Sequence, residues 1–193
     1  MTQRYRDMMF TPAVRAAQER NGSTDLYDSA AATNEAPDEL GEAEIEFITA
    51  RDSFYMATIS ATDWPYMQHR GGPKGFVKIL GPRTIGIADY RGNRQYVSIG
   101  NLADNDRASL FFMDYLNRRR LKMLTRVRLV DLADEPEMAG KLQDPAYRAK
   151  VERGLVFEIE AFDWNCPQHI TQRLTVDEMR ALSAMDGRSG PGT

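Results

Sequence analysis

The clearest pattern in the chain lies between residues 119 and 131, where apolar and polar side chains alternate. Leu121, Met123 and Val127 fall on one side of an extended backbone, and the residues on the other side are largely basic. This alternation predicts a long strand with one face in the core and the other toward water or a ligand. Shorter β-rich segments occur at residues 54–60, 66–70, 75–80, 84–88, 108–113 and 155–162.

Turn-forming residues separate these segments, among them Asp63-Trp64-Pro65 and Gly81-Pro82. Six or so short strands, separated by tight turns and joined by short helices, are typical of a small antiparallel barrel. We therefore predict a mainly β protein of the α+β class.

Helical periodicity occurs in four places. Residues 39–52 place Leu40, Ile45 and Ile48 on one side and the glutamates at 42, 44 and 46 toward water. Residues 94–104 and 135–152 are also predicted to be helical. Thr175 and Glu178 form a capping box that opens a closing helix.

These elements divide the chain into three parts. Residues 1–38 are expected to form an N-terminal arm with some helix and a loop, and residues 39–186 a single barrel domain. Residues 187–193 are expected to be a disordered tail, because they are short, polar and terminal.

Composition narrows the class of protein. The chain has 193 residues and a net charge of −3, which argues against a strongly basic nucleic-acid-binding protein. It has one cysteine, so an internal disulfide framework is excluded and a reducing compartment is expected. Because there is neither an apolar stretch long enough to span a bilayer nor a secretory signal, we expect a cytoplasmic protein.

The first candidate site is the segment Gln-His-Arg-Gly-Gly-Pro-Lys at residues 68–74. Two glycines beside basic and hydrogen-bonding residues allow the backbone to approach a charged ligand. The alternative is a β-bulge or loop with solvated charges, and the two interpretations have about even weight. The segment has neither Walker nor G-x-G-x-x-G spacing, which excludes both nucleotide signatures.

The second candidate is the segment from Asp89 to Gln95, which follows a strand and opens a predicted helix. Arg94 would lie in the first turn of that helix, where the helix dipole favours an anion such as phosphate. A guanidinium there would add a forked, charge-assisted contact. The alternative is a hairpin turn with exposed charges.

Two further segments carry reactive or charged residues. In Arg118-Arg119-Arg120 successive side chains alternate between faces, and Arg119 shares the face of Leu121, so it is the arginine expected to point inward. In the segment at residues 164–169, Trp164 offers a stacking surface and Cys166 a thiol. One cysteine and two histidines cannot supply a four-ligand zinc site. Two interpretations of Cys166 stay open: the segment caps a ligand pocket from a partner subunit, or, because most lone cysteines are buried, Cys166 packs after the last strand.

Taken in order, these segments resemble the pyridoxamine 5'-phosphate oxidase-like, FMN-binding family over residues 54–130. The resemblance rests on Ala57-Thr58-Ile59, Trp64-Pro65-Tyr66, Ile87-Ala88-Asp89, Asn93-Arg94-Gln95, residues 105–111 and Leu116-Asn117-Arg118-Arg119. The Gln-His-Arg-Gly-Gly-Pro segment and the Cys-Pro-Gln-His-Ile segment at 166–170 are similar to a subgroup described as flavin-nucleotide-binding proteins.

The resemblance implies a six-stranded split barrel, a homodimer and FMN bound in the cleft between subunits. It implies that Arg94 grips the flavin phosphate, with Gln95 in place of a lysine, and that His69 or Arg70 helps to hold FMN. Arg119 stands where the family has a glutamine that touches the flavin. The Ser-Arg-Pro segment and the Gln-Ser pair of the oxidases are not found, so pyridoxamine phosphate is not expected as the substrate.

The function expected from this resemblance is that of an FMN-dependent oxidoreductase, with NADH or NADPH as a possible electron donor. The alternative is a non-catalytic protein that binds flavin, heme or a deazaflavin. No catalytic residue and no metal site is assigned. The residues expected to bind the cofactor are Gln68, His69, Arg70, Gly71, Lys78, Asp89, Asn93, Arg94, Gln95, Arg119, Trp164 and Cys166.

Overall fold

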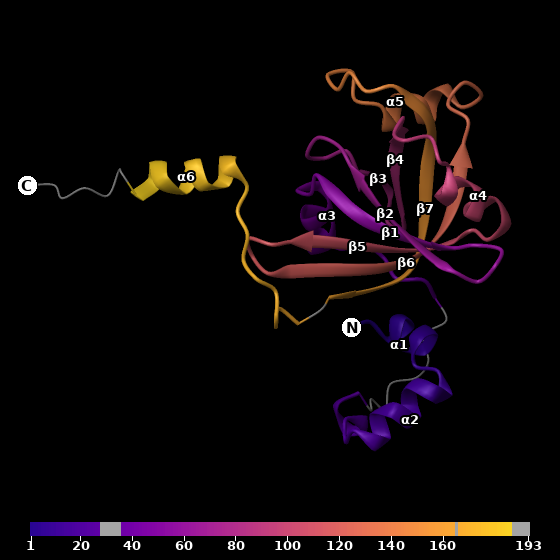
Figure 1. Ribbon diagram of the computed structural model, residues 1–193, viewed down its shortest axis with the longest axis vertical. Helices are drawn as coiled ribbons and strands as arrows, with labels where there is room; N and C mark the ends of the chain where they lie inside the picture. The colour runs from indigo at the N-terminus through magenta and orange to yellow at the C-terminus, as the bar shows by residue number, and fades with distance from the viewer. Residues whose placement is uncertain (28–35, 165, 187–193) are drawn as a thin grey trace, which may run out of the picture.

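A computed structural model describes residues 1–27, 36–164 and 166–186. The expected tail at 187–193 and part of the expected loop, residues 28–35, lie outside the described residues. The strands form one antiparallel sheet in the order β2-β1-β5-β6-β7-β4-β3 (Figure 1). Their bounds are β1 Ser53–Ile59, β2 Pro65–Gly71, β3 Lys78–Gly81, β4 Thr84–Tyr90, β5 Arg107–Asp114, β6 Arg119–Val130 and β7 Val151–Trp164. The described chain thus has seven strands, one at each of the seven segments predicted from the sequence, whereas the family resemblance implies a six-stranded barrel.

Short helices surround this sheet in the predicted α+β arrangement. They are α1 Gln3–Met9, α2 Pro12–Arg20, α3 Glu42–Thr49, α4 Val97–Asp104, α5 Pro136–Leu142 and α6 Val176–Asp186, with a 3-10 turn at Thr24–Leu26. Helix α1 packs on β7, and its Tyr5 is buried. The described residues include no helix long and apolar enough to cross a membrane.

The sheet curls around a core of aromatic and aliphatic side chains. Phe54 lies at its centre, with its ring 4.9 Å from that of Phe112, 5.9 Å from Phe76 and 6.1 Å from Phe157. The predicted alternation of the long strand is confirmed, because Leu121, Met123, Thr125 and Val127 of β6 are buried. The curl also brings β2, at one end of the strand order, within contact of β4, since Arg70 of β2 forms an ion pair with Asp89 of β4.

Three local predictions were wrong. The helix predicted over residues 135–152 is confined to α5, because Pro145 follows shortly after and Val151 already begins β7. The helix predicted from residue 94 begins only at Val97. The side chain of Glu44 is half-buried rather than turned fully to water, because it accepts a hydrogen bond of 2.6 Å from Nε1 of Trp164.

Candidate functional site

A small polar pocket lies where β2, the end of β4 and the loop before α4 meet. Its cavity volume is about 40 Å³, which is room for a few water molecules or one phosphate-sized group. Five of the twelve candidate residues line it: Gln68, Arg70, Asp89, Asn93 and Arg94. The fold therefore brings the first and second candidate segments together, although their members lie up to 26 positions apart in the sequence. We call this hollow the arginine pocket.

A buried ion pair forms the inner wall of the arginine pocket. Nη1 of Arg70 lies 2.5 Å from Oδ1 of Asp89, and the two side chains are only 12% and 6% exposed. Nε of Arg153, which is opposite Asp89 on β7, lies 3.5 Å from the other carboxylate oxygen. Burial raises the pKa of Asp89 above its ordinary value, while the positive charges of Arg70 and Arg153 partly offset that shift.

The loop that leads into α4 carries Arg94 to the rim of the pocket. Arg94 has a φ of +63° and Tyr96 a φ of +55°, so two residues with side chains adopt the left-handed conformation. The carbonyl oxygen of the Asn93 side chain accepts a hydrogen bond from the backbone N–H of Gln95 at 3.1 Å. This Asx turn and the two left-handed residues turn the chain sharply and leave Arg94 exposed, before the helix rather than in its first turn.

Polar residues that the sequence did not single out complete the rim. Glu152 of β7 accepts hydrogen bonds from Nε of Arg91 at 2.7 Å and from the Tyr96 hydroxyl at 3.2 Å. The bond from Arg91 is the main reason why the pKa of Glu152 lies below its ordinary value. Ser98, buried in the first turn of α4, donates to Oε1 of Gln68 at 2.9 Å. Glu152 could not be found from the sequence, because β7 was not predicted to extend back to residue 151.

The arginine pocket has the chemistry of an anion site. Nε of Arg70 is buried and has no hydrogen-bond partner within residues 1–27, 36–164 and 166–186. A buried guanidinium nitrogen without a partner is costly, so the guanidinium of Arg70, which lines the pocket, keeps hydrogen-bonding capacity that an anion could use. The size of the cavity matches a phosphate group but is far too small for a flavin ring. The residues present therefore fit the phosphate end of FMN, and the rest of such a ligand would have to lie beyond the rim.

Three other candidates lie outside the arginine pocket. His69 points to the opposite side of β2, where its ring meets that of Tyr55 at 5.6 Å. A Cβ atom at Gly71 would lie 3.0 Å from the His69 ring, so this glycine serves local packing. Lys78 donates to the carbonyl oxygen of Gly75 at 2.8 Å and lines a separate hollow beside β3.

Arg119 and Trp164 lie together in a second cluster, near the end of the β5–β6 hairpin. The Arg119 guanidinium lies 4.6 Å from the Trp164 ring centroid and 5.3 Å from that of Phe47. Arg119 contacts these rings on the face that it shares with Leu121, as predicted, but it stays exposed at the start of β6. Within one copy of the chain, these residues form a cation–π stack against α3 and do not line the arginine pocket.

The remaining two candidates are exposed. Gln95 makes its contacts with Asn93 in the Asx turn. Cys166 is free and exposed, so the expectation that it packs after the last strand is wrong. The chain turns away there, because Pro167 follows and His169 adopts a φ of +62°.

The outer face of the β2-β1-β5-β6 part of the sheet is unusually apolar for a solvent-facing surface. Its centre is formed by Tyr55, Ala57, Met67, Phe111 and Met113, and the exposed fraction of Met67 reaches 66%. A hollow of about 560 Å³ on this face is bordered by Arg120, Lys122 and Arg173. A second hollow of about 420 Å³ continues it toward α1, and the two share Ala57 and Ser109.

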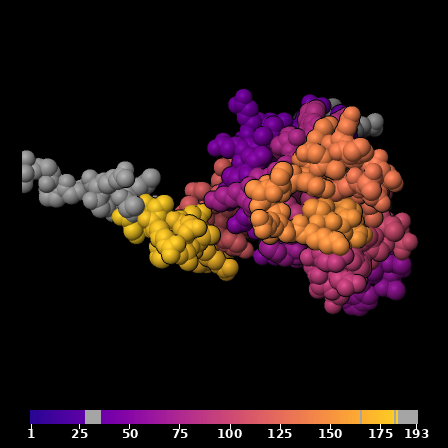
Figure 2. All heavy atoms as spheres, turned by 90° about the horizontal axis from the view of Figure 1, so that it is seen from above, coloured from indigo at the N-terminus to yellow at the C-terminus, as the bar shows by residue number. Residues whose placement is uncertain are grey.

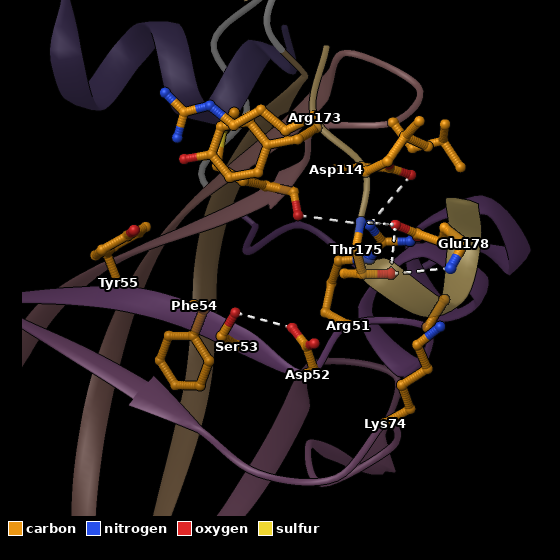
Figure 3. A pocket seen from close by; sticks show the side chains of 15 residues that line it. Arg51, Asp52, Ser53, Phe54, Tyr55, Lys74, Asp114, Arg173, Thr175 and Glu178 are labelled. Carbon is orange, nitrogen blue, oxygen red and sulfur yellow. Dashed lines mark hydrogen bonds and ion pairs between the residues drawn. The ribbon is translucent and has the colours of Figure 1, made fainter. Parts of the chain in front are cut away.

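A polar crevice at the end of the β5–β6 hairpin holds the segment that precedes α6 (Figure 3). Its wall contains an ion pair of 3.1 Å between Arg51 and Asp114. Burial raises the pKa of Asp114, but hydrogen bonds from Asn117 and the charge of Arg51 outweigh burial, so the pKa lies below its ordinary value. Thr175 and Glu178 form the predicted capping box at the mouth of this crevice.

The family model described as pyridoxamine 5'-phosphate oxidase matches residues 40–164, which contain all seven strands. No protein of curated function matches the sequence.

Several solved structures are similar to the chain. A putative pyridoxamine 5'-phosphate oxidase from Lactobacillus delbrueckii is 16% identical with a TM-score of 0.49, over 65% of this chain and 93% of that one. HupZ from Group A Streptococcus is 12% identical with a TM-score of 0.49, over 70% and 100%. An FMN-binding protein from Syntrophomonas wolfei is 14% identical with a TM-score of 0.42, over 63% and 85%. Similarities at this level carry no information on substrate.

Proposed function

Because the chain belongs to the pyridoxamine 5'-phosphate oxidase family, with the split-barrel α+β fold, we propose that it is a homodimeric FMN-binding protein whose arginine pocket takes the flavin phosphate. The observation that carries this proposal is the unpartnered Nε of Arg70, buried beside a cavity of phosphate size. Arg94 at the rim would close the other side of the phosphate.

A second copy of the chain accounts for the rest of the ligand. The pocket encloses only a phosphate-sized volume, so the isoalloxazine ring must lie over an open rim. The outer face described above is apolar, and the described residues of one copy leave its hollows open; extended apolar surfaces of this kind mark protein–protein interfaces. A partner that covers this face would also help to enclose the ring.

The residues of this chain would bind and orient, and the flavin, when bound, would supply two-electron redox chemistry. Arg70 and Arg94 would neutralise the phosphate charge with charge-assisted hydrogen bonds. Asp89 would hold Arg70 in place from behind. Trp164 and Arg119 offer a planar, cationic surface that a partner subunit could present to the flavin.

The binding site is tested by comparing Arg94→Ala with Arg91→Ala. Arg94 lines the pocket without a carboxylate partner among the described residues, whereas Arg91 is engaged by Glu152 at 2.7 Å. Loss of one phosphate contact should weaken FMN binding by about 1.5–3 kcal/mol, which is roughly tenfold or more. Fluorescence titration of the purified apoprotein with FMN measures both dissociation constants.

Titration with riboflavin supplies the control for this comparison. Riboflavin lacks the phosphate, so Arg94→Ala should leave its affinity nearly unchanged. Equal FMN affinities for the two variants would contradict the assignment of the arginine pocket.

The nature of the cofactor and the question of turnover need separate measurements. We expect the chromophore released from the purified protein to have the mass and absorbance of FMN, whereas FAD, a deazaflavin or a heme Soret band would contradict the proposal. Oxidation of NADH or NADPH by the loaded protein would indicate an oxidoreductase. A yellow protein without turnover with either donor would favour a flavin carrier.

A further inference from the structure

The C-terminal helix α6 stands apart from the barrel. Figures 1 and 2 show it projecting beyond the end of the β5–β6 hairpin, reached by an extended strap. Val176 and Met179 lie on one side of this helix and are 57% and 53% exposed. An isolated helix of 11 residues is marginal in water, so its stability requires a surface on which this apolar side can pack.

The strap is firmly held at the hairpin end of its own barrel. Nε2 of Gln172 donates to the carbonyl oxygen of Leu116 at 2.7 Å, and the Arg173 guanidinium lies 4.9 Å from the Tyr115 ring centroid. Glu178 is in the crevice of Figure 3, where the positive charge of Lys74 helps to lower its pKa after the Thr175 hydrogen bonds. Gln172 and Arg173 therefore fix the strap just before α6, and the apolar Val176 and Met179 of the helix remain exposed.

An apolar groove that the described residues leave open lies on the same molecule, at the far end of the outer face. This is the hollow of about 420 Å³, lined by Met8, Met9, Ala57, Ile59, Pro65 and Leu124 and bordered by Arg4, Arg107 and Arg126. The side chains of Met8, Met9 and Ile59 are 38%, 41% and 46% exposed. A groove of this kind is the usual receptor for the apolar side of an amphipathic helix.

The helix cannot reach this groove in its own chain. The groove is bordered by Arg107 at the start of β5, and the strap is fixed beside Asp114 at the end of that strand. Seven residues of strand separate these positions, or about 24 Å at ~3.4 Å per residue. Since Gln172 and Arg173 hold the strap and α6 begins only three positions after Arg173, Met179 remains at the hairpin end of the barrel, away from the groove.

We propose that α6 of each copy packs into the apolar groove of a second copy, so that the two subunits exchange C-terminal helices. Charge is compatible with this pairing, because the guanidinium of Arg107 has no carboxylate partner in the described part of the chain and the first turn of α6 carries Asp177. Asp177 is 92% exposed and pairs with Arg180 of its own helix at 3.1 Å, and an ion pair this exposed is weak enough to be exchanged for one across the interface. The exchange rests on the homodimer of the proposed function and adds to it the segment that joins the two copies.

Cysteine pairing tests the exchange in the full-length protein. In a Cys166→Ser background, Met179→Cys and Met9→Cys are made in separate preparations, mixed and oxidised mildly. We expect a covalent dimer containing one chain of each kind, formed much faster than with Ala181→Cys in place of Met179→Cys. Ala181 is an exposed residue on the opposite side of the helix and supplies the matched control.

The double variant Val176→Glu/Met179→Glu provides a second measurement, by sedimentation equilibrium of the apoprotein. Its dimer dissociation constant should rise about tenfold or more, while Ala181→Glu leaves it unchanged. A dimer that tolerates the double variant and gives no cross-link would overturn the exchange and leave the homodimer intact. The exchange would also be overturned if a chain carrying both Met179→Cys and Met9→Cys formed an intramolecular cross-link at high dilution. FMN titration of each variant reports separately on the arginine pocket.

Discussion

Arg70 and Asp89 allow the sharpest test of the arginine pocket, and the test needs no ligand. The change is Arg70→Met, which removes the guanidinium but keeps an unbranched side chain to fill the space. It leaves the carboxylate of Asp89, 6% exposed, without its partner at 2.5 Å. The remaining positive charge is that of Arg153, whose Nε lies 3.5 Å from the other oxygen.

The size of the effect follows from this geometry. Removing one member of a buried ion pair typically costs about 3–5 kcal/mol, because a charge is left buried without compensation. Since Arg153 still faces Asp89, we expect the lower end, near 3 kcal/mol. Urea unfolding at pH 7, followed by tryptophan fluorescence, measures the loss of unfolding free energy.

The same pair predicts how this loss depends on pH. The folded-state pKa of Asp89 is already above its ordinary value of 3.8, so its ionised form costs stability at neutral pH, and the cost disappears as the pH falls through that raised pKa. Without Arg70 the folded-state pKa of Asp89 should rise further, so protonation of Asp89 begins to remove its destabilising charge at a higher pH. The difference between wild type and variant should therefore narrow as the pH is lowered toward 4.

Two results would refute this reasoning. One is a loss below about 1 kcal/mol at pH 7, and the other is a difference that stays constant from pH 8 to about 4.5. Asp89→Asn added to Arg70→Met should recover part of the lost stability, since it removes the stranded charge. Arg94→Ala, at the exposed rim, serves as the control and should change the unfolding free energy by no more than about 0.5 kcal/mol.

Three further predictions concern other parts of the structure. The pKa of Asp114 is lowered in the folded state, so this carboxylate adds stability above its unfolded pKa, and that stability is lost as the pH falls through the folded value. Urea unfolding should therefore show Asp114→Asn to be less stable than wild type at pH 7 but equal to it in strong acid. Glu44→Ala removes the acceptor for Trp164 and should cost about 1.5 kcal/mol in the same assay, whereas Glu46→Ala, exposed in the same helix, should cost far less. Cys166 should react with a thiol reagent at once in the apoprotein and more slowly after FMN is added; equal rates would place this thiol away from the flavin.

Elements with a strong local pattern could be predicted from the sequence. Strand β6 was predicted because its alternation continues over a dozen residues. Helix α6 was predicted because Thr175 and Glu178 form a capping box at its N-terminus. The failures arose where the local pattern is weak. Residues 143–152 resemble a helix in composition, but pairing of Val151 with Tyr90 of β4 makes a strand of their last members, and only tertiary contacts decide this.

The arginine pocket was predictable only in part, for a related reason. Arg70 and Arg94 were identified by their segments, and the buried Asp89 by its place at the end of an apolar strand. Arg153 was missed because it reaches Asp89 through the β4–β7 register, 64 positions away along the chain. The position of Arg94 before α4 depends on left-handed backbone at two residues that are not glycine, which is uncommon and has no clear signature in the sequence.

The position of β7 in the sheet has a consequence for biosynthesis. β7 is the last strand to be made, yet it lies between β6 and β4 and pairs with both. Until it emerges from the ribosome, the β3–β4 hairpin has no other strand to pair with, and the core beneath it is open to water. The barrel must therefore close after translation has passed residue 164. A nascent chain that stalls earlier exposes the unpaired edges of β4 and β6 to other chains.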